Sequence, residues 1–175
     1  MANAHNIHEA YRQGDLAALK TALNYPPNFP NQRGQQGLDE NCLEYAIYHS
    51  PISFIRTLLA IGADPNYDDR SFPSLIAALS TSRSDKYDVV LLSHAYGADL
   101  QQRGINDYTP LHYAANDDDP RAIELLLSLG ADPQARTNVD EFATPLEEAV
   151  HLGRLRAVKA LKDWVDHRKE GVTHE

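Results

Sequence analysis

Apolar residues recur along this chain at the three- and four-residue spacing of amphipathic α-helices. The clearest stretches are Phe-Ile-Arg-Thr-Leu-Leu at 54–59 and Ile-Glu-Leu-Leu-Leu at 123–127. A glycine follows each stretch, at Gly62 and Gly130, where a left-handed residue ends a helix most easily. A second, shorter helix is predicted ahead of each stretch, separated from it by a tight turn. The pattern therefore predicts short helices arranged in pairs.

Two short strings repeat at a nearly constant period. Gly-Ala-Asp begins the segments 62–65, 97–99 and 130–133, and the three glycines lie 35 and then 33 residues apart. Thr-Pro-Leu opens the segments 109–115 and 144–150, which are again 35 residues apart. Because isolated helices of this length are marginal in water, each pair must bury its apolar face against the next pair.

These strings resemble the ankyrin-repeat family, whose repeat of about 33 residues carries a Thr-Pro-Leu-His-x-Ala signature. The separation of 19 residues from Leu111 to Gly130, and from Leu43 to Gly62, is that of the family. The resemblance implies an all-α, ankyrin-repeat solenoid of helix-turn-helix repeats with hairpin-like finger loops. It covers one domain, residues 1–175, with five repeats. Their approximate bounds are 4–34, 35–70, 71–105, 106–139 and 140–170.

The residues at the expected helix starts have the chemistry of N-caps. Thr109 and Thr144 can accept hydrogen bonds from the N–H groups of a first turn, and each precedes a proline suited to the first helical position. Glu147, three residues after Thr144, completes a capping box, and Asn41 with Glu44 has the same spacing.

Two parts of the array depart from the repeat pattern. The first and last repeats are expected to act as caps with polar outer faces, with Trp164 over the final seam. In repeat three, 22 residues separate Leu75 from Gly97, three more than in repeats two and four. The extra residues fall in Ser80–Tyr87, between the two helices. This segment is either a neutral surface insertion or a functional loop.

Charge narrows the classes of partner. The chain has 16 basic and 25 acidic residues and a formal net charge of −9, which disfavours nucleic acids and anionic membranes and favours a basic protein surface. Its single cysteine, Cys42, cannot form an internal disulfide. Neither a secretory signal nor an apolar stretch of about 18 residues is evident. The sequence thus predicts a cytoplasmic protein, with export by a route lacking an N-terminal signal left open.

No catalytic, cofactor or metal site is predicted, because the sequence has no HExxH, CxxC, phosphate loop or nucleophile elbow. His112 occupies the histidine slot of the signature, where the resemblance implies hydrogen bonds between loops. The acidic run at 116–119 lacks the glycine and distal glutamate of a calcium loop and is interpreted as a charged turn. Cys42 is expected to be a buried, inert thiol. Catalysis hidden in repeat three remains an alternative.

The resemblance also implies where a partner binds, since ankyrin arrays usually bind along the concave side formed by fingers and first helices. Tyrosine beside carboxylates suits contact with a basic protein. Packing of the tyrosines on one another and solvation by the acids is the alternative. The matching positions are Tyr45, Tyr48, His49, Tyr67, Asp68, Asp69, Arg103, Asp107, Tyr108, Tyr113, Asn116 and Asp117.

The predicted function is a protein–protein interaction module without catalytic activity, monomeric when free, that binds another protein through its concave face. One alternative is a dedicated inhibitor or immunity-type protein that blocks a basic enzyme or toxin. A second alternative is a scaffold or stabilising subunit.

Overall fold

The computed structural model describes residues 2–31, 41–67, 72–138 and 143–171. The chain divides into two compact units, Met1–Asp99 and Leu100–Glu175. Throughout the described residues the secondary structure is helical, without strands, and the α-helices form five consecutive pairs. The all-α prediction is confirmed, and each pair falls within or close to one of the five predicted repeats. The expectation of one domain over 1–175 stays a prediction.

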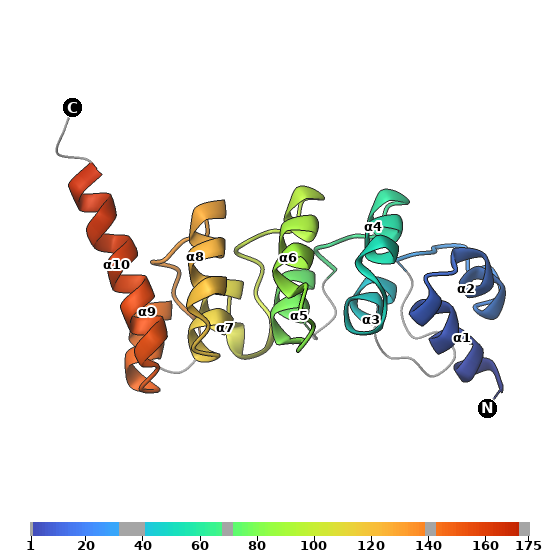
Figure 1. Cartoon of the computed structure of the whole chain (residues 1–175), viewed down its shortest axis with the longest axis horizontal. Coiled ribbons are helices and arrows are strands. Elements are labelled where there is room, and N and C mark those ends of the chain that lie inside the picture. Colours follow the sequence, from blue (N-terminus) through green and yellow to red (C-terminus); the bar gives the residue numbers. More distant parts are fainter. Residues whose placement is uncertain (1, 32–40, 68–71, 139–142, 172–175) are drawn as a thin grey trace. The chain divides into compact units, whose positions relative to one another are not determined.

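The first unit contains three helix pairs (Figure 1). First helices pack in a row, α3 lying between α1 and α5, while α4 packs against α6. Their bounds are α1 Ala2–Gln13, α2 Leu16–Ala22, α3 Cys42–His49, α4 Ile52–Ala60, α5 Ser74–Ser80 and α6 Lys86–Ala95.

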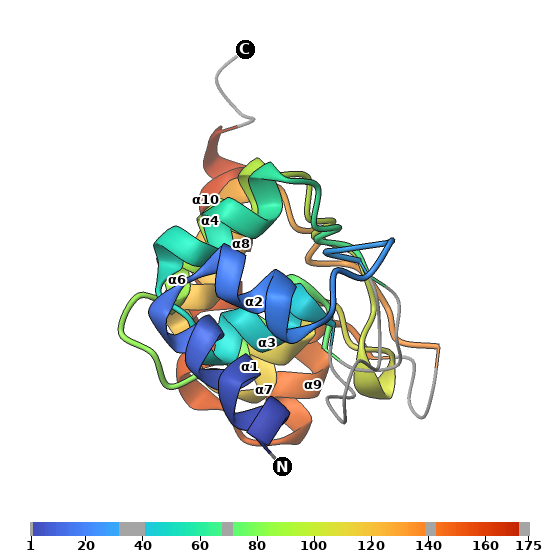
Figure 2. The ribbon, with the colours of Figure 1, turned by 90° about the vertical axis from the view of Figure 1, so that its right-hand side faces the viewer.

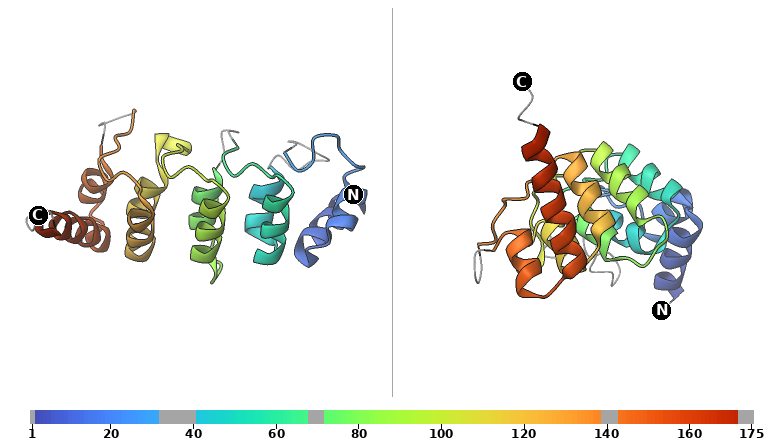
Figure 3. Two further views of the ribbon diagram at one scale, coloured as in Figure 1. Left: turned by 90° about the horizontal axis from the view of Figure 1, so that it is seen from above. Right: turned by 60° about the vertical axis from the view of Figure 1, so that its left-hand side comes forward.

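The second unit contains two helix pairs preceded by a short 3-10 helix. Its α7 packs against α9, and α10 runs along both α8 and α9 (Figure 3). The bounds are η1 Ile105–Asp107, α7 Pro110–Asn116, α8 Pro120–Leu129, α9 Pro145–His151 and α10 Leu155–Gly171.

The predicted N-caps are confirmed. The Thr109 hydroxyl accepts the N–H of His112 at 3.4 Å, and the Thr144 hydroxyl accepts that of Glu147 at 3.3 Å. Glu147 returns the bond by accepting the N–H of Thr144 at 2.8 Å, which completes the capping box. Asn41 caps α3 by accepting from the N–H of Leu43. These bonds satisfy backbone donors that have no partner inside the helix.

The helix ends and close approaches also follow the pattern. Gly62, Gly97 and Gly130 have φ of 98°, 94° and 104°, in the left-handed region that glycine adopts without strain. One alanine in each of the first helices α3, α5, α7 and α9 is fully or almost fully buried. These residues are Ala46, Ala78, Ala114 and Ala149.

The insertion of repeat three lies where it was predicted. Residues 81–85 link α5 to α6, whereas two or three residues link the helices of every other pair. The loop projects from the first unit on the side opposite the segments that follow α2 and α4 (Figure 2). Arg83 anchors it: the guanidinium binds Asp85 at 2.5 and 2.9 Å and donates to the Ile47 carbonyl of α3 at 2.6 Å.

The last helix pair does not have the polar surface expected of a cap. Val150 on α9 is 58% exposed, although the matching residues Tyr11, Ile47 and Ala115 are buried. Leu155, at the start of α10, is 78% exposed. The surface of this helix pair therefore combines charged side chains with exposed apolar ones.

Candidate protein-interaction surface

An aromatic patch on the first unit, formed by His8, Tyr45, Tyr48 and His49, brings together three of the predicted residues. His8 Nδ1 lies 2.8 Å from the Tyr45 hydroxyl, and the rings of Tyr45 and His49 are 4.3 Å apart. Tyr45 is only 8% exposed and also packs against Tyr11. His49 is exposed, and its ring packs against that of the buried Tyr45.

Two tyrosines that the sequence predicted to contact a partner, Tyr48 and Tyr67, have hydrogen-bond partners within the fold. The Tyr48 hydroxyl lies 2.9 Å from Ser80 Oγ and so ties α3 to the end of α5. Tyr67 is buried and donates to the Phe72 carbonyl at 2.7 Å. These bonds hold the repeat together. Asp68 and Asp69, which the sequence placed in the same finger, lie outside the described residues.

An asparagine clamp joins consecutive fingers of the first unit. Asn66 donates to the Gly97 carbonyl at 2.8 Å and accepts the N–H of Asp99 at 2.7 Å. Asn31, in the equivalent position one repeat earlier, donates to the Gly62 carbonyl and accepts the N–H of Asp64, each at 2.8 Å. The sequence interpretation missed this clamp, although two asparagines spaced by one repeat were a visible signal.

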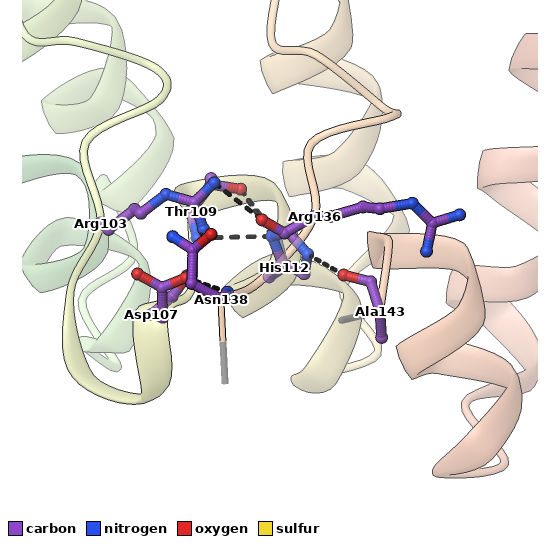
Figure 4. Close-up of polar contacts among 7 residues, drawn as sticks. All are labelled: Arg103, Asp107, Thr109, His112, Arg136, Asn138 and Ala143. Carbon is purple, nitrogen blue, oxygen red and sulfur yellow. Dashed lines mark hydrogen bonds and ion pairs between the residues drawn. The ribbon is translucent and has the colours of Figure 1, made fainter. Parts of the chain in front are cut away.

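A finger network in the second unit, formed by Arg103, Asp107, Arg136 and Asn138, joins its two fingers (Figure 4). Arg103 donates to the Asp107 carboxylate at 2.6 Å and to the Arg136 carbonyl at 2.8 Å. The same carboxylate accepts the N–H of Asn138 at 2.5 Å. Two residues predicted to contact a partner, Arg103 and Asp107, therefore have internal ionic and hydrogen-bond partners and act as supports.

The finger network presents an exposed tip at Ile105, which is not among the contact residues predicted from the sequence. Ile105, in η1, is 49% exposed, and the neighbouring Asn106 is exposed with φ of 59°. An apolar side chain on a rigid, exposed tip is well suited to contact another protein.

The core beneath the fingers contains His112, which is fully buried (Figure 4). Its Nε2 lies 3.0 Å from the Ala143 carbonyl and its Nδ1 lies 2.8 Å from the Thr109 hydroxyl. Burial lowers the pKa of His112 below its ordinary value, opposed by the bond to Ala143. A neutral imidazole with the proton on Nε2 satisfies both contacts, which confirms the predicted structural role.

Tyr108 is held between this core and α9. Its hydroxyl donates to the Glu148 carboxylate, and its ring stacks on that of His112 with centroids 5.6 Å apart. Tyr108 is half-buried. With these contacts, Tyr108 acts mainly as a support within the fold.

The acidic turn after α7 divides into exposed and occupied carboxylates. Asp117 is exposed, and Tyr113 and Asn116 beside it on α7 are half-buried. Asp118 accepts the N–H of Ala157 at 2.7 Å and so caps α10, and Asp119 caps its own helix α8. The charged-turn interpretation is confirmed, since both carboxylates satisfy helix N-termini.

Other chemistry is sparse in the described part of the chain. Burial raises the pKa of the Cys42 thiol, which disfavours the reactive thiolate and supports the expected inert role. Among the described residues, no three His, Cys, Asp or Glu side chains are grouped to hold a metal ion. Of the helices described, none combines the length and apolar character needed to cross a bilayer.

Comparison with known proteins places the chain in a class of helical repeat proteins. The family profile described as ankyrin repeats (3 copies) matches residues 75–170. The chain belongs to the ankyrin-repeat family, and its repeats are of the kind that generally mediates protein–protein interaction.

The proteins similar to this chain include a toxin, a regulatory subunit and a subunit of a larger complex. Alpha-latrocrustotoxin-Lt1a of Latrodectus tredecimguttatus is 33% identical over 59% of this chain and 7% of its own length. Protein phosphatase 1 regulatory subunit 27 of Mus musculus is 38% identical over 45% of this chain and 51% of its own. The target of rapamycin complex 2 subunit AVO2 of Saccharomyces cerevisiae is 27% identical over 89% of this chain and 36% of its own. In each case the match spans about half of the relative's length or less.

Proposed function

We propose that this chain binds a basic partner protein through the exposed side chains of its first helices and fingers, the concave face of an ankyrin array. The observation that carries the proposal is the finger network. It fixes the two fingers of the second unit to each other, so that Ile105 and Asn106 project from a preorganised support. A rigid support lowers the entropy lost when a partner binds.

The sequence-predicted residues take two roles in this proposal. Exposed or half-buried residues make the contacts, and residues that are buried or bonded to neighbouring elements hold them in position. The contact residues are His49, Tyr48, Tyr113, Asn116, Asp117 and the added Ile105. The supporting residues are Tyr45, Tyr67, Arg103, Asp107 and Tyr108.

A basic partner is supported by charge. The chain carries a formal net charge of −9, and Asp117 has no ion-pair partner among the described residues. Opposite charge accelerates encounter between proteins, and salt screens that effect over about 8–10 Å. Binding is expected to weaken as ionic strength rises.

What binding does to the partner distinguishes the two narrower roles. The relative named as a regulatory subunit of protein phosphatase 1 supports a regulatory or inhibitory role. The relative named as a subunit of target of rapamycin complex 2 supports the scaffold alternative. Loss of partner activity in a one-to-one complex supports inhibition, and full activity in a stable complex supports a scaffold.

The test is capture of a partner from lysate of the source organism by immobilised wild type and two charge reversals. Asp117→Lys changes the proposed surface, and Glu124→Lys makes the matched change at an exposed position of α8. We expect wild type and Glu124→Lys to retain the same partner and Asp117→Lys to lose it. Equal capture by all three folded proteins would rule out this surface.

A further inference from the structure

A groove lies on the first unit between α4 and α6, away from the first helices. It has a volume of about 480 Å³. Four apolar side chains line it and two charged ones flank them. The lining residues are Ile52, Arg56, Asp88, Leu91, Leu92 and Ala95.

Leu91 is an exception within the repeat pattern. It lies six residues before the glycine that ends its helix segment, as do Arg56 in repeat two and Glu124 in repeat four. The other repeats thus carry a charged side chain where this one carries a leucine that is 42% exposed. The repeat framework does not require an apolar side chain there, so Leu91 is a specific property of this groove.

Two side chains of opposite charge also flank the groove. Arg56 on α4 and Asp88 on α6 are exposed, and within the described part of the chain neither forms an ion pair or a side-chain hydrogen bond. An apolar floor between an unpaired cation and an unpaired anion favours a ligand with an apolar stripe and charges of both signs beside it.

We propose that this groove docks an amphipathic helix of a partner protein, with a carboxylate near Arg56 and a cationic group near Asp88. Asp88, then Leu91 and Leu92, then Ala95 lie on three successive turns of α6, so the groove runs along this helix for about 10 Å. A helix with apolar residues at i, i+3 or i+4, and i+7 matches that length.

Other occupants fit less well. An extended peptide added as a strand needs a sheet edge with unpaired backbone groups, and both walls here are helices. A second copy of the chain would set one concave groove against another and leave space between them, which forfeits packing contacts. The partner helix fills the groove from a convex surface.

The test uses a displayed library of helical peptides with leucine fixed at an i, i+4, i+7 spacing and with flanking positions varied among Glu, Lys and Ser. The first comparison is between wild type, Leu91→Lys and Ile61→Lys. Ile61 is a matched control, because it is also 42% exposed but does not line the groove. Leu91→Lys should fold, since charged residues occupy the equivalent positions. Ala95→Glu, at another exposed lining position, is the second groove variant.

We expect wild type and Ile61→Lys to enrich the same peptides, with acidic residues on one flank and basic residues on the other. Both groove variants should bind the selected peptides at least about tenfold more weakly. The double variant Arg56→Glu/Asp88→Lys should invert the flank preference. Asp117→Lys should bind these peptides as wild type does, because the groove is independent of the surface proposed above.

Three results would overturn the proposal. The first is that wild type enriches no peptide above the level of Leu91→Lys. The second is that the selected peptides bind the groove variants as tightly as wild type, or show no preference for flanking charge. The third is a concentration-dependent dimer in sedimentation velocity that Leu91→Lys abolishes, which would assign the groove to a second copy of the chain.

Discussion

Replacing His112 by alanine tests whether the core under the fingers of the second unit is held as described. The imidazole is fully buried and links α7 to the segment before α9 through the Ala143 carbonyl. It also contacts the hydroxyl of Thr109, the N-cap of α7. Alanine removes both contacts and leaves a cavity where the ring was.

The magnitude follows from the groups left behind. A buried carbonyl without a partner costs about 1–3 kcal/mol, and loss of the bond to Thr109 costs about 1 kcal/mol more. Truncation of a large buried ring adds a cavity cost of roughly 1–2 kcal/mol. Because Thr137 also donates to the Ala143 carbonyl at 3.1 Å, that acceptor keeps one partner, and we expect a total of about 3–4 kcal/mol.

Urea unfolding followed by circular dichroism measures this loss, and hydrogen exchange locates it. For a protein of this size, the same loss of unfolding free energy corresponds to a fall of roughly 6–16 °C in the melting temperature. The amide of Thr137 should exchange faster, because its acceptor is no longer fixed by His112. His5→Ala, at an exposed position of α1, is the control and should change stability by less than about 0.5 kcal/mol. A loss below about 1 kcal/mol for His112→Ala, with unchanged exchange at Thr137, would refute the assigned role.

Three further changes test other parts of the structure. The pKa of His112 is lowered in the folded state from its ordinary value of 6.5. As the pH falls below 6.5 the unfolded chain therefore binds the proton first, and the folded state loses stability. Urea midpoints at about pH 7.5 and 5.5 should differ more for wild type than for His112→Gln. Ser93→Ala should raise stability by about 1 kcal/mol in the same assay, because the buried hydroxyl has no partner in the described part of the chain, and a decrease would contradict this. Arg103→Ala should lower stability by about 1–2 kcal/mol and speed amide exchange at Asn138, whereas the exposed Arg156→Ala should do neither.

Much of the fold could be predicted because the repeat signals are local. A threonine before proline, or a glycine after an apolar stretch, favours a helix start or end through bonds and dihedral angles within a few residues. The position of the insertion could be predicted from the number of residues between Leu75 and Gly97. The anchoring of Arg83 to Ile47 in the preceding repeat could not be predicted, since it depends on how a five-residue loop folds back across 36 residues of sequence.

The candidate surface was less predictable, because it too depends on contacts between residues that are far apart in the sequence. Matching a residue to a repeat slot gives its helix face but not its neighbours. Tyr45 occupies the expected slot, yet His8 and Tyr11 from the preceding repeat cover it. Arg103 and Asp107 are charged finger residues, but the backbone of the next finger accepts and donates their hydrogen bonds.

Counting carboxylates therefore overstates how much of the net charge faces a partner. Asp107, Asp118 and Asp119 accept backbone N–H groups, and so contribute to stability, whereas Asp117 is exposed at the end of α7. Asp119→Ala should thus lower stability by about 1 kcal/mol through loss of an N-cap. Asp117→Ala should leave stability within about 0.5 kcal/mol of wild type and slow association with a basic partner. Stopped-flow association rates at two salt concentrations, beside urea midpoints, separate these effects. An association rate that is insensitive to Asp117 would show that the exposed carboxylate of this turn does not face the partner.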